Sequence, residues 1–275
     1  MEIKNISKED ALRDYMEMLD FDLYKLTTDT KVGNKWIDHF TFEERINTIS
    51  VKGIHFKQFI EHHLNTPSVK KMIDFYKGDT RVYILYKIYK FIHGTVGLFS
   101  PIRAREILYI YQPNTVLDPC MGWGCRMTGT ASLGIPRYIG VDLNPNLRIP
   151  LTMMSVELQR VSNTSMQLFF GDCLQIDYSK LTYDCIFTSP PYFNTELYTG
   201  TKRRTKKDWV ASFYEPLFKV IWKHLQPKGV MILSIPRDVF SIVCRVLNKQ
   251  PITQYLFLRR HRSKEPEYIY VWAKD

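Results

Sequence analysis

Short apolar runs alternate with longer amphipathic stretches from about residue 98 to the end of the chain. The short runs are rich in β-branched and aromatic residues, which favour strands, whereas the longer stretches repeat apolar residues at helical spacing. Because strands and helices alternate in this way, we expect an α/β fold with a mostly parallel sheet. The expected strands lie at about 114–118, 136–141, 166–170, 183–187, 229–235, 253–258 and 268–272.

The last two expected strands are joined by a short polar stretch rather than by a helix. They are predicted to form an antiparallel hairpin at the end of the otherwise parallel sheet. Before them, apolar residues recur every four positions and predict a long amphipathic helix, which Pro216 is expected to kink. These apolar positions are Trp209, Phe213, Leu217, Ile221 and Leu225.

The first 95 residues carry a different pattern, which predicts a mostly helical region. Ser7, with Asp10 three residues later, is typical of a helix N-cap. A second short helix is predicted at 68–77, closed by Gly78. Between them the pattern is mixed, and large aromatic residues such as Trp36 are expected to be packed. The first helix is expected to bury one face, with apolar residues at Leu12, Tyr15, Met16, Leu19, Leu23 and Leu26.

The chain has 275 residues, which fits one large domain with an appendage. A turn-rich join near 94–101 separates the helical region 1–95 from a main domain at 96–275. The helical region is expected to pack on the main domain or to contact a substrate. The formal net charge of +10 is consistent with a polyanionic partner, although many basic proteins bind no nucleic acid.

Five cysteines are scattered along the chain, an odd number that fits a reducing interior better than a disulfide framework. Neither a membrane-length apolar run nor a signal-peptide core is evident. We therefore expect an intracellular protein, cytoplasmic in a bacterial, phage or viral setting, or nuclear. Cys120 and Cys125 lack a second matching pair, so no metal site is expected.

A cofactor site is predicted where the first strand ends at Asp118 and continues as Pro119-Cys120-Met121-Gly122-Trp123-Gly124. Glycines allow close approach of a ligand to the backbone, and the following helix offers free amides. The dinucleotide pattern is not met, because Met127 stands where its third glycine would be. A carboxylate here suits a cationic ligand better than a pyrophosphate, which favours S-adenosylmethionine (SAM).

Two further acidic residues follow strands. Asp142 ends the second strand, where a carboxylate can accept hydrogen bonds from both ribose hydroxyls. Asp172 follows the third strand and could accept from an adenine amino group. Taken singly, each is better explained as a turn or capping residue. The adjacent Leu143 and Cys173 are included in the predicted cofactor set.

The fourth strand ends in Thr188-Ser189-Pro190-Pro191-Tyr192. Open α/β sheets bind ligands beyond the carboxyl ends of their strands, so this rigid turn would place a hydroxyl, carbonyl groups and an aromatic ring in the site. An ordinary proline-containing loop is the alternative. A basic segment follows and could contact phosphates, or it could be a solvated charge run. The expected nucleic-acid contacts are Phe193, Lys202, Arg203, Arg204, Lys206, Lys207, Arg260 and Arg262.

Together these motifs resemble the amino-methyltransferases of DNA, which methylate cytosine N4 or adenine N6, over about residues 98–275. The glycine loop is similar to their SAM-binding D-P-x-x-G-x-G segment, and Thr188–Tyr192 is similar to their catalytic tetrapeptide in the form found in cytosine-N4 enzymes. Uncharacterised phage and viral members, some labelled adenine-specific, also resemble Ser189–Tyr198. Phe99-Ser100-Pro101, which should open a helix, looks like the segment that covers the methionine end of SAM.

The resemblance implies direct methyl transfer to the exocyclic amine of a flipped base. Ser189 and the Pro190 carbonyl would accept from the two amine hydrogens, Pro191 would stiffen the turn, and Tyr192 would stack on the base. Cytosine N4 is the favoured target and adenine N6 the close rival. RNA methylation, protein amide methylation and an inactive DNA-binding subunit are more distant rivals. A restriction-modification role, a homo-oligomer or a partner subunit would be compatible with the chain.

Overall fold

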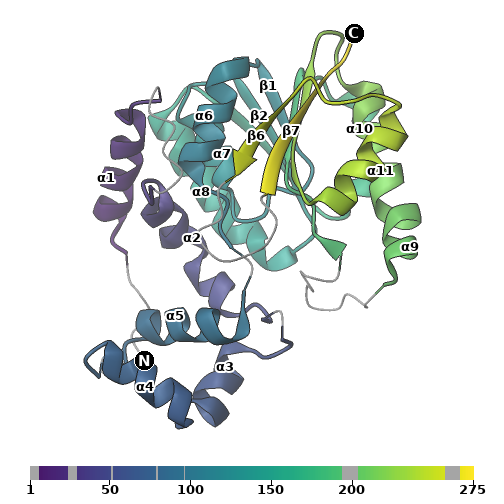
Figure 1. The fold of residues 1–275 in the computed structure, drawn as a ribbon. Helices are drawn as coiled ribbons and strands as arrows, with labels where there is room; N and C mark the ends of the chain where they lie inside the picture. Colours follow the sequence, from purple (N-terminus) through teal and green to yellow (C-terminus); the bar gives the residue numbers. More distant parts are fainter. Residues whose placement is uncertain are drawn as a thin grey trace.

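The computed structural model of the chain describes residues 6–23, 30–50, 52–78, 80–95, 97–193, 204–257 and 267–275. Its centre is a seven-stranded sheet in the order β3-β2-β1-β4-β5-β7-β6 (Figure 1). The strands are β1 (Thr115–Asp118), β2 (Arg137–Asp142), β3 (Ser165–Phe170), β4 (Cys185–Thr188), β5 (Val230–Ile235), β6 (Thr253–Phe257) and β7 (Glu267–Ala273).

Five strands are parallel, and β7 enters antiparallel between β5 and β6. This confirms the predicted α/β fold, with a mostly parallel, Rossmann-like sheet and a C-terminal antiparallel hairpin. The chain leaves β1 toward β2 and later returns to β4 on the other side of β1. The strand order therefore reverses at β1, and open α/β sheets bind ligands at such a point, beyond the carboxyl ends of the strands.

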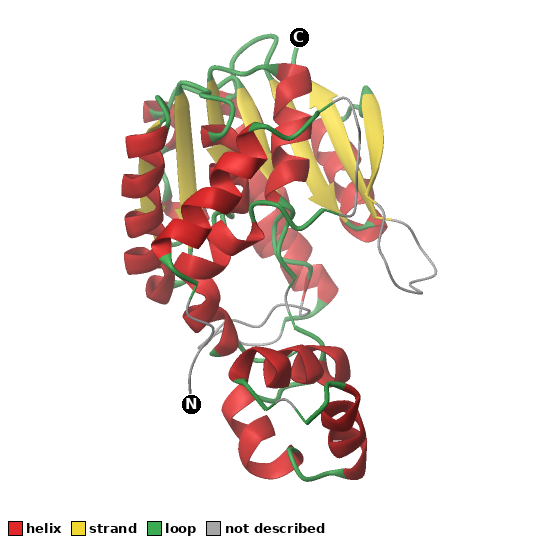
Figure 2. Ribbon diagram, turned by 90° about the vertical axis from the view of Figure 1, so that its left-hand side faces the viewer, coloured by secondary structure: helices red, strands yellow, loops and turns green. Residues whose placement is uncertain are grey.

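Helices cover both faces of the sheet (Figures 1 and 2). Successive strand residues point to opposite faces, so Val116 packs in one core cluster and Leu117 in the other. This double burial explains why the central strands read as continuous apolar runs. One face is covered by α6 (Pro101–Tyr111), α7 (Cys125–Ala131) and α8 (Arg148–Val161), and the other by α10 (Glu215–His224) and α11 (Arg237–Leu247).

The long helix predicted around Pro216 is present, with a local widening instead of a sharp kink. It begins as α9 (Lys206–Trp209), continues as one π-helical stretch, η6 (Val210–Tyr214), and ends as α10. Proline has no backbone N–H and its ring clashes with the preceding turn of an α-helix. A π-helical turn just before Pro216 accommodates both effects without breaking the helix.

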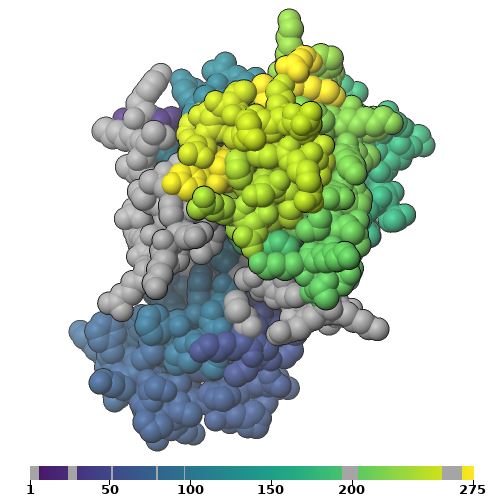
Figure 3. All heavy atoms as spheres, turned by 45° about the vertical axis from the view of Figure 1, so that its right-hand side comes forward, coloured from purple at the N-terminus to yellow at the C-terminus, as the bar shows by residue number. Residues whose placement is uncertain are grey.

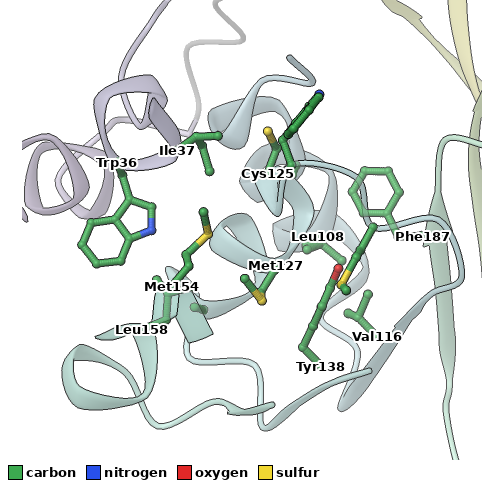
Figure 4. Packing of buried hydrophobic residues seen from close by; sticks show 14 of the residues in the cluster. Trp36, Ile37, Leu108, Val116, Cys125, Met127, Tyr138, Met154, Leu158 and Phe187 are labelled. Atoms are coloured by element: carbon green, nitrogen blue, oxygen red, sulfur yellow. The ribbon is translucent and has the colours of Figure 1, made fainter. Parts of the chain in front are cut away.

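The N-terminal region divides its packing between two cores. Ser7 caps α1 (Lys8–Leu19) as predicted, through its hydroxyl and the Asp10 amide. Tyr15 and Met18 of α1 are buried in the same cluster as α6 to α8. Figure 4 shows Trp36 and Ile37 of α2 (Asn34–Ile46) beside Met154 and Leu158 of α8. Helix α1 ends at Leu19, so the predicted helical position Leu23 lies beyond it, and Leu26 lies outside the described residues.

From Phe42 onward the chain builds a separate helical cluster, here called the small unit. It contains the end of α2, then α3 (Phe56–Gln58), η1 (Phe59–His63), α4 (Pro67–Phe75) and α5 (Val82–His93). Figure 3 shows it in blue as a lobe below the C-terminal part of the chain. Helix α4 matches the prediction at 68–77, with Gly78 donating back to Ile73 at the helix end. None of the described helices is long and apolar enough to cross a membrane.

Candidate active site

The predicted motifs after β1, β2, β3 and β4 lie along the carboxyl edge of the sheet. The parallel register places Asp118 beside Gly140 and Asp142 beside Phe170. Neighbouring parallel strands that end at similar heights bring the segments after them together. The sheet therefore brings the glycine loop, the two acidic turns and the Ser-Pro-Pro-Tyr turn to one region.

Asp118 is completely buried and already neutralised. Its carboxylate accepts from Arg126 Nε at 2.7 Å and Nη2 at 3.2 Å, and from the Tyr138 hydroxyl at 2.9 Å. This corrects the expectation that Asp118 holds a cationic ligand, because its charge is paired inside the protein. Arg126 also donates to the Cys120 carbonyl at 2.5 Å, so the ion pair fixes the start of the glycine loop.

The glycine loop needs its two glycines for different reasons. Both have a positive φ, +53° at Gly122 and +78° at Gly124, where side chains are strained. A Cβ on Gly124 would come within 2.9 Å of Met154 Sδ, whereas a Cβ on Gly122 would project into open space. The missing side chain at Gly124 therefore allows the loop to pack against α8, and the missing side chain at Gly122 leaves open space beside the loop.

Asp142 ties the glycine loop to β2. Its carboxylate accepts from the Gly122 amide at 2.8 Å and from the Asn144 amide at 2.9 Å. Burial of the side chain, only 7% exposed, raises the pKa of Asp142 to about 6, while these two amides oppose the rise. One amide at each oxygen leaves lone pairs that can accept from further donors, as a ribose-binding carboxylate requires.

The turns after β2 and β3 offer one apolar and one acidic exposed side chain. Leu143 is 52% exposed directly after Asp142. Asp172 is exposed and caps a short 3₁₀ turn by accepting from the Leu174 amide at 2.9 Å. Cys173 is buried, and its contact with Cys120, followed by burial, raises the pKa of the Cys120 thiol well above its usual value. A protonated thiol is a poor nucleophile, which fits a reaction without a cysteine adduct.

Phe99, Ser100 and Pro101 lie at the start of α6, as predicted. The Ser100 hydroxyl caps the helix by accepting from the Arg103 amide at 3.2 Å, and Pro101 occupies the first turn. The Phe99 ring contacts the Phe187 ring edge-on at 5.7 Å, and the Arg126 guanidinium lies 5.4 Å from the Phe99 centroid. Phe99 therefore spans the segment between the glycine loop and the end of β4.

A directed chain of hydrogen bonds fixes the turn after β4. The Tyr192 hydroxyl donates to the Ser234 carbonyl of β5 at 2.9 Å, and it lies 3.1 Å from Ser189 Oγ. Because a carbonyl only accepts, this bond uses the single Tyr192 proton. Ser189 must then donate to Tyr192, and its remaining lone pairs can accept from another group.

The two prolines of the turn differ in their carbonyl groups. The Pro191 carbonyl accepts from the Tyr214 hydroxyl at 2.6 Å, and Tyr214 in turn accepts from the Phe193 amide at 3.0 Å. Within the described part of the chain, no donor reaches the Pro190 carbonyl. The expectation that Phe193 contacts nucleic acid gains no support, because its ring packs edge-on against Tyr214 at 5.3 Å in the second core cluster.

The basic segment lies partly outside the described residues, which exclude Lys202, Arg203, Arg260 and Arg262. Arg204 donates to Ser212 and lies over the Trp209 ring at 5.3 Å. Lys206 pairs with Asp238 and lies 5.2 Å from the Phe193 ring centroid. Lys207 is exposed on the first turn of α9. Arg204 and Lys206 thus have partners within the protein, and Lys207 remains open to solvent.

The site also depends on four residues that the sequence motifs did not indicate. Arg126 and Tyr138 neutralise and hold Asp118, while Ser234 and Tyr214 fix the turn after β4. Arg126 lies on the first turn of α7, close after the glycine loop, where a buried cation could have been suspected. Ser234 and Tyr214 come from distant segments, so only the folded chain shows their role.

Comparison with solved structures gives low-identity matches to methyltransferases. The chain is similar to TrmN from Thermus thermophilus, with TM-score 0.47 and 19% identity over 65% of this chain and 50% of that chain. It is similar to an RNA methyltransferase from Salinibacter ruber, in complex with S-adenosyl-L-homocysteine, with TM-score 0.43 and 14% identity over 65% of this chain and 93% of that one. A SAM-dependent O-methyltransferase from Thermotoga maritima gives TM-score 0.44 and 9% identity over 68% and 70%.

The chain thus spans half the length of the TrmN structure. No protein-family model matches the sequence, and the search of curated proteins found no match. The strand order of the sheet carries the assignment of the fold.

Proposed function

We propose that the protein is a SAM-dependent methyltransferase that methylates the exocyclic amine of a nucleic-acid base. The hydrogen-bond direction at Ser189 carries this proposal. An amine has two N–H groups, and the turn after β4 offers two acceptors, Ser189 Oγ and the Pro190 carbonyl. Both belong to the turn at the carboxyl edge of the sheet, near the glycine loop that is proposed to hold the methyl donor.

The residues along the sheet edge fit SAM. Gly122 leaves open space, Asp142 has free lone pairs for ribose hydroxyls, and Leu143 and Asp172 are exposed for the adenine. Phe99 would cover the methionine end. When bound, SAM supplies a methyl group made electrophilic by its sulfonium. The buried Asp118–Arg126 pair holds the loop and does not contact the cofactor directly.

In the proposed mechanism, the protein accelerates methyl transfer by holding the amine nitrogen in line with the methyl group. Two acceptors in fixed positions hold the N–H groups, so the nitrogen lone pair turns out of conjugation with the ring. The Tyr192–Ser234 bond holds Ser189 in the accepting state throughout. After transfer the nitrogen carries a positive charge and is strongly acidic, so water can take its proton.

The favoured substrate is cytosine N4 in DNA, through the resemblance of Ser189 to the cytosine-N4 form of the motif. Adenine N6 would use the same two acceptors, and a flipped base would be required in a duplex. RNA is the second substrate class, because an exocyclic amine in RNA presents the same donors and one of the similar structures is an RNA methyltransferase.

The test is to incubate the protein with SAM and unmethylated DNA or RNA, digest to nucleosides, and identify methylated products by mass spectrometry. We expect N4-methylcytosine from DNA; N6-methyladenine would retain the mechanism and change the base. Product from RNA alone would reassign the substrate class. SAM binding with no methylated nucleoside from either polymer would refute the enzyme and favour the inactive-subunit alternative.

A further inference from the structure

The solvent-facing side of α5 consists of cations and aromatic rings. Seven of the twelve residues of this helix are buried in the small unit. Of the remaining five, Tyr83, Lys87, Lys90 and Phe91 share one helical face, because they are spaced by three, four or one positions around it. The helix contains no acidic residue. Such a face has no counter-charge of its own.

Lys90 and Phe91 are exposed on this face, whereas Tyr83 and Lys87 are half-buried. Phe91 is 75% exposed, a large apolar ring left in water. The Lys87 ammonium lies 4.2 Å from the Tyr83 ring centroid. Helix α4 also places a lysine next to an exposed aromatic ring. Its Phe75 is 82% exposed and lies one helical turn after Lys71. Single exposed apolar residues are common on protein surfaces, but rings interleaved with lysines are typical of single-strand nucleic-acid binding.

The charge of the chain is concentrated in the small unit. Residues 42–95, which form the small unit, contain nine Lys and Arg against five Asp and Glu, a net charge of +4 out of the +10 of the whole chain. These residues make up less than a fifth of the sequence. A polyanion would therefore be attracted to this lobe as well as to the sheet domain.

The end of α5 lies near the end of α2, which contacts the glycine loop. Lys90 is exposed, yet burial, and then the charge of Arg45, lower the pKa of its ammonium, while Asp38 opposes the shift. The Lys90 ammonium therefore lies close enough to α2 for the charges of Arg45 and Asp38 to act on it. Arg45 also lies 6.0 Å from the ring centroid of Trp123 in the glycine loop. Figure 1 shows α5 on the side of the small unit nearest the sheet.

We infer that the face formed by Tyr83, Lys87, Lys90 and Phe91 binds a single-stranded stretch of nucleic acid next to the base being methylated. The two lysines would contact phosphates, and an unpaired base would stack on Phe91. The inference deepens the proposed function, because it assigns substrate binding to the small unit. Single-stranded nucleic acid is favoured over duplex because a ring can stack only on a base whose face is free.

The test measures binding and not turnover. Fluorescence anisotropy would follow a labelled 20-nucleotide single strand, as DNA and as RNA, with the full-length protein and no SAM. Phe91→Leu keeps apolar bulk without an aromatic face, and we expect it to weaken binding between about 5-fold and 100-fold. Phe91→Trp should bind at least as tightly as the natural protein. Ile110→Ala is the control, because Ile110 is an exposed apolar residue away from this face, on α6.

Substitution of the two lysines should change the salt dependence of binding. The double variant Lys87→Gln and Lys90→Gln should reduce the slope of log affinity against log salt by about 1.4, since each phosphate contact in a single strand contributes about 0.7. Lys219→Gln, an exposed lysine on α10, should leave binding unchanged. A duplex of the same sequence should respond to the lysine variants but hardly to Phe91→Leu.

Two results would overturn the inference. One is single-strand binding by Phe91→Leu and the lysine variant that is as tight as in the natural protein, with SAM affinity retained. The other is dissociation of an oligomer by Phe91→Leu, seen by light scattering, which would make the face a self-association surface. If binding depends on α5 as expected but no methylated nucleoside forms, the proposed function fails while this inference stands.

Discussion

Asp142 combines a structural and a binding role in one carboxylate. It accepts from the Gly122 amide and so positions the glycine loop, and it has lone pairs left for the ribose of a cofactor. Burial disfavours its charged form and raises its pKa to about 6. Hydroxyl donors from a ligand favour the charged form instead. Ligand affinity and protonation of Asp142 are therefore linked.

We predict that SAM affinity is constant above about pH 7 and about tenfold weaker at pH 5, one unit below the pKa of Asp142. Isothermal titration calorimetry across this range would show proton release on binding below pH 6. Asp142→Ala should bind SAM more weakly and without this pH dependence. Without ligand, the stability of the protein changes with pH in the opposite direction to SAM affinity. The pKa of Asp142 is higher in the folded than in the unfolded chain, so its ionisation lowers the free energy of unfolding as pH rises from about 4 to 6. An affinity independent of pH would remove Asp142 from the ribose role.

A second prediction concerns the hydrogen-bond direction at Ser189. Tyr192→Phe keeps the ring but removes the hydroxyl that accepts from Ser189 and donates to Ser234. Freed from this bond, Ser189 can turn its proton toward the substrate amine. We expect kcat to fall by roughly 10- to 100-fold, about 1.4 to 2.8 kcal/mol, with SAM affinity unchanged.

Tyr192→Ala, which also removes the ring, should nearly abolish turnover while SAM binding survives. Steady-state kinetics together with SAM titration would separate the two variants. Equal loss of SAM affinity in Tyr192→Phe would show that the turn supports the cofactor instead of the amine.

At this scale the sequence indicated which residue types were in the site but not how they were paired. Asp118 was expected to face a cationic ligand, and the cation it meets is Arg126 of its own chain. A buried carboxylate needs a partner, yet a sequence does not say whether that partner is a ligand or a side chain. The proton on Ser189 likewise depends on the Ser234 carbonyl, 45 residues away in the chain.

At the scale of elements, the glycine loop links strand β1 to helix α7 under two separate constraints. A side chain at Gly124 would clash with α8. A side chain at Gly122 would instead enter the open space where the cofactor is proposed to bind. Gly134 provides a natural comparison, since it also has a positive φ, +62°, and open space around its Cβ position, but it lies in an exposed turn after α7.

We predict that Gly122→Ala and Gly134→Ala each lower the free energy of unfolding by about 1 kcal/mol, because both force alanine into the left-handed region. Only Gly122→Ala should also weaken SAM binding, by about tenfold or more, equivalent to roughly 1.4 kcal/mol. Thermal unfolding and SAM titration on the same preparations would check both statements. Equal SAM affinity in the two variants would place the cofactor away from Gly122.

The strands of the sheet and the helix caps at Ser7 and Ser100 could be predicted, because local patterns determine them. Helix α5 was not identified individually, since its run of β-branched and aromatic residues is typical of a strand. Its apolar face packs on α2 and on η1, so tertiary burial outweighs local preference. The opposite face of α5 carries Tyr83, Lys87, Lys90 and Phe91, which are proposed to bind the substrate.

At the scale of the whole molecule, the N-terminal region belongs to two cores. Trp36 near the start of α2 is buried with Met154 of the sheet domain, while Phe42 near its end is buried in the small unit. Arg105 of α6 donates to the Leu19 and Phe21 carbonyls, which fastens the end of α1 to the sheet domain. Helix α2 therefore connects the lobe that carries the α5 face to the sheet domain.

This division predicts different consequences for two buried aromatic residues of the N-terminal region. Trp36→Ala should lower the unfolding free energy of the sheet domain by about 3–5 kcal/mol, because it leaves a cavity in that core. Phe59→Ala removes a ring of similar burial from the small unit and should loosen that unit alone. SAM affinity should survive Phe59→Ala, whereas nucleic-acid affinity should fall if α5 supplies the contacts.

Hydrogen exchange read by mass spectrometry would distinguish the two cores. In Trp36→Ala the amides of β1 and β2 should exchange faster, together with those of α1. In Phe59→Ala faster exchange should be confined to α4, α5 and the end of α2, since local cores can open separately from the global transition. Faster exchange of β1 in both variants would mean that the small unit and the sheet unfold as one cooperative body, and that substrate binding at α5 and catalysis at β4 cannot be separated by mutation.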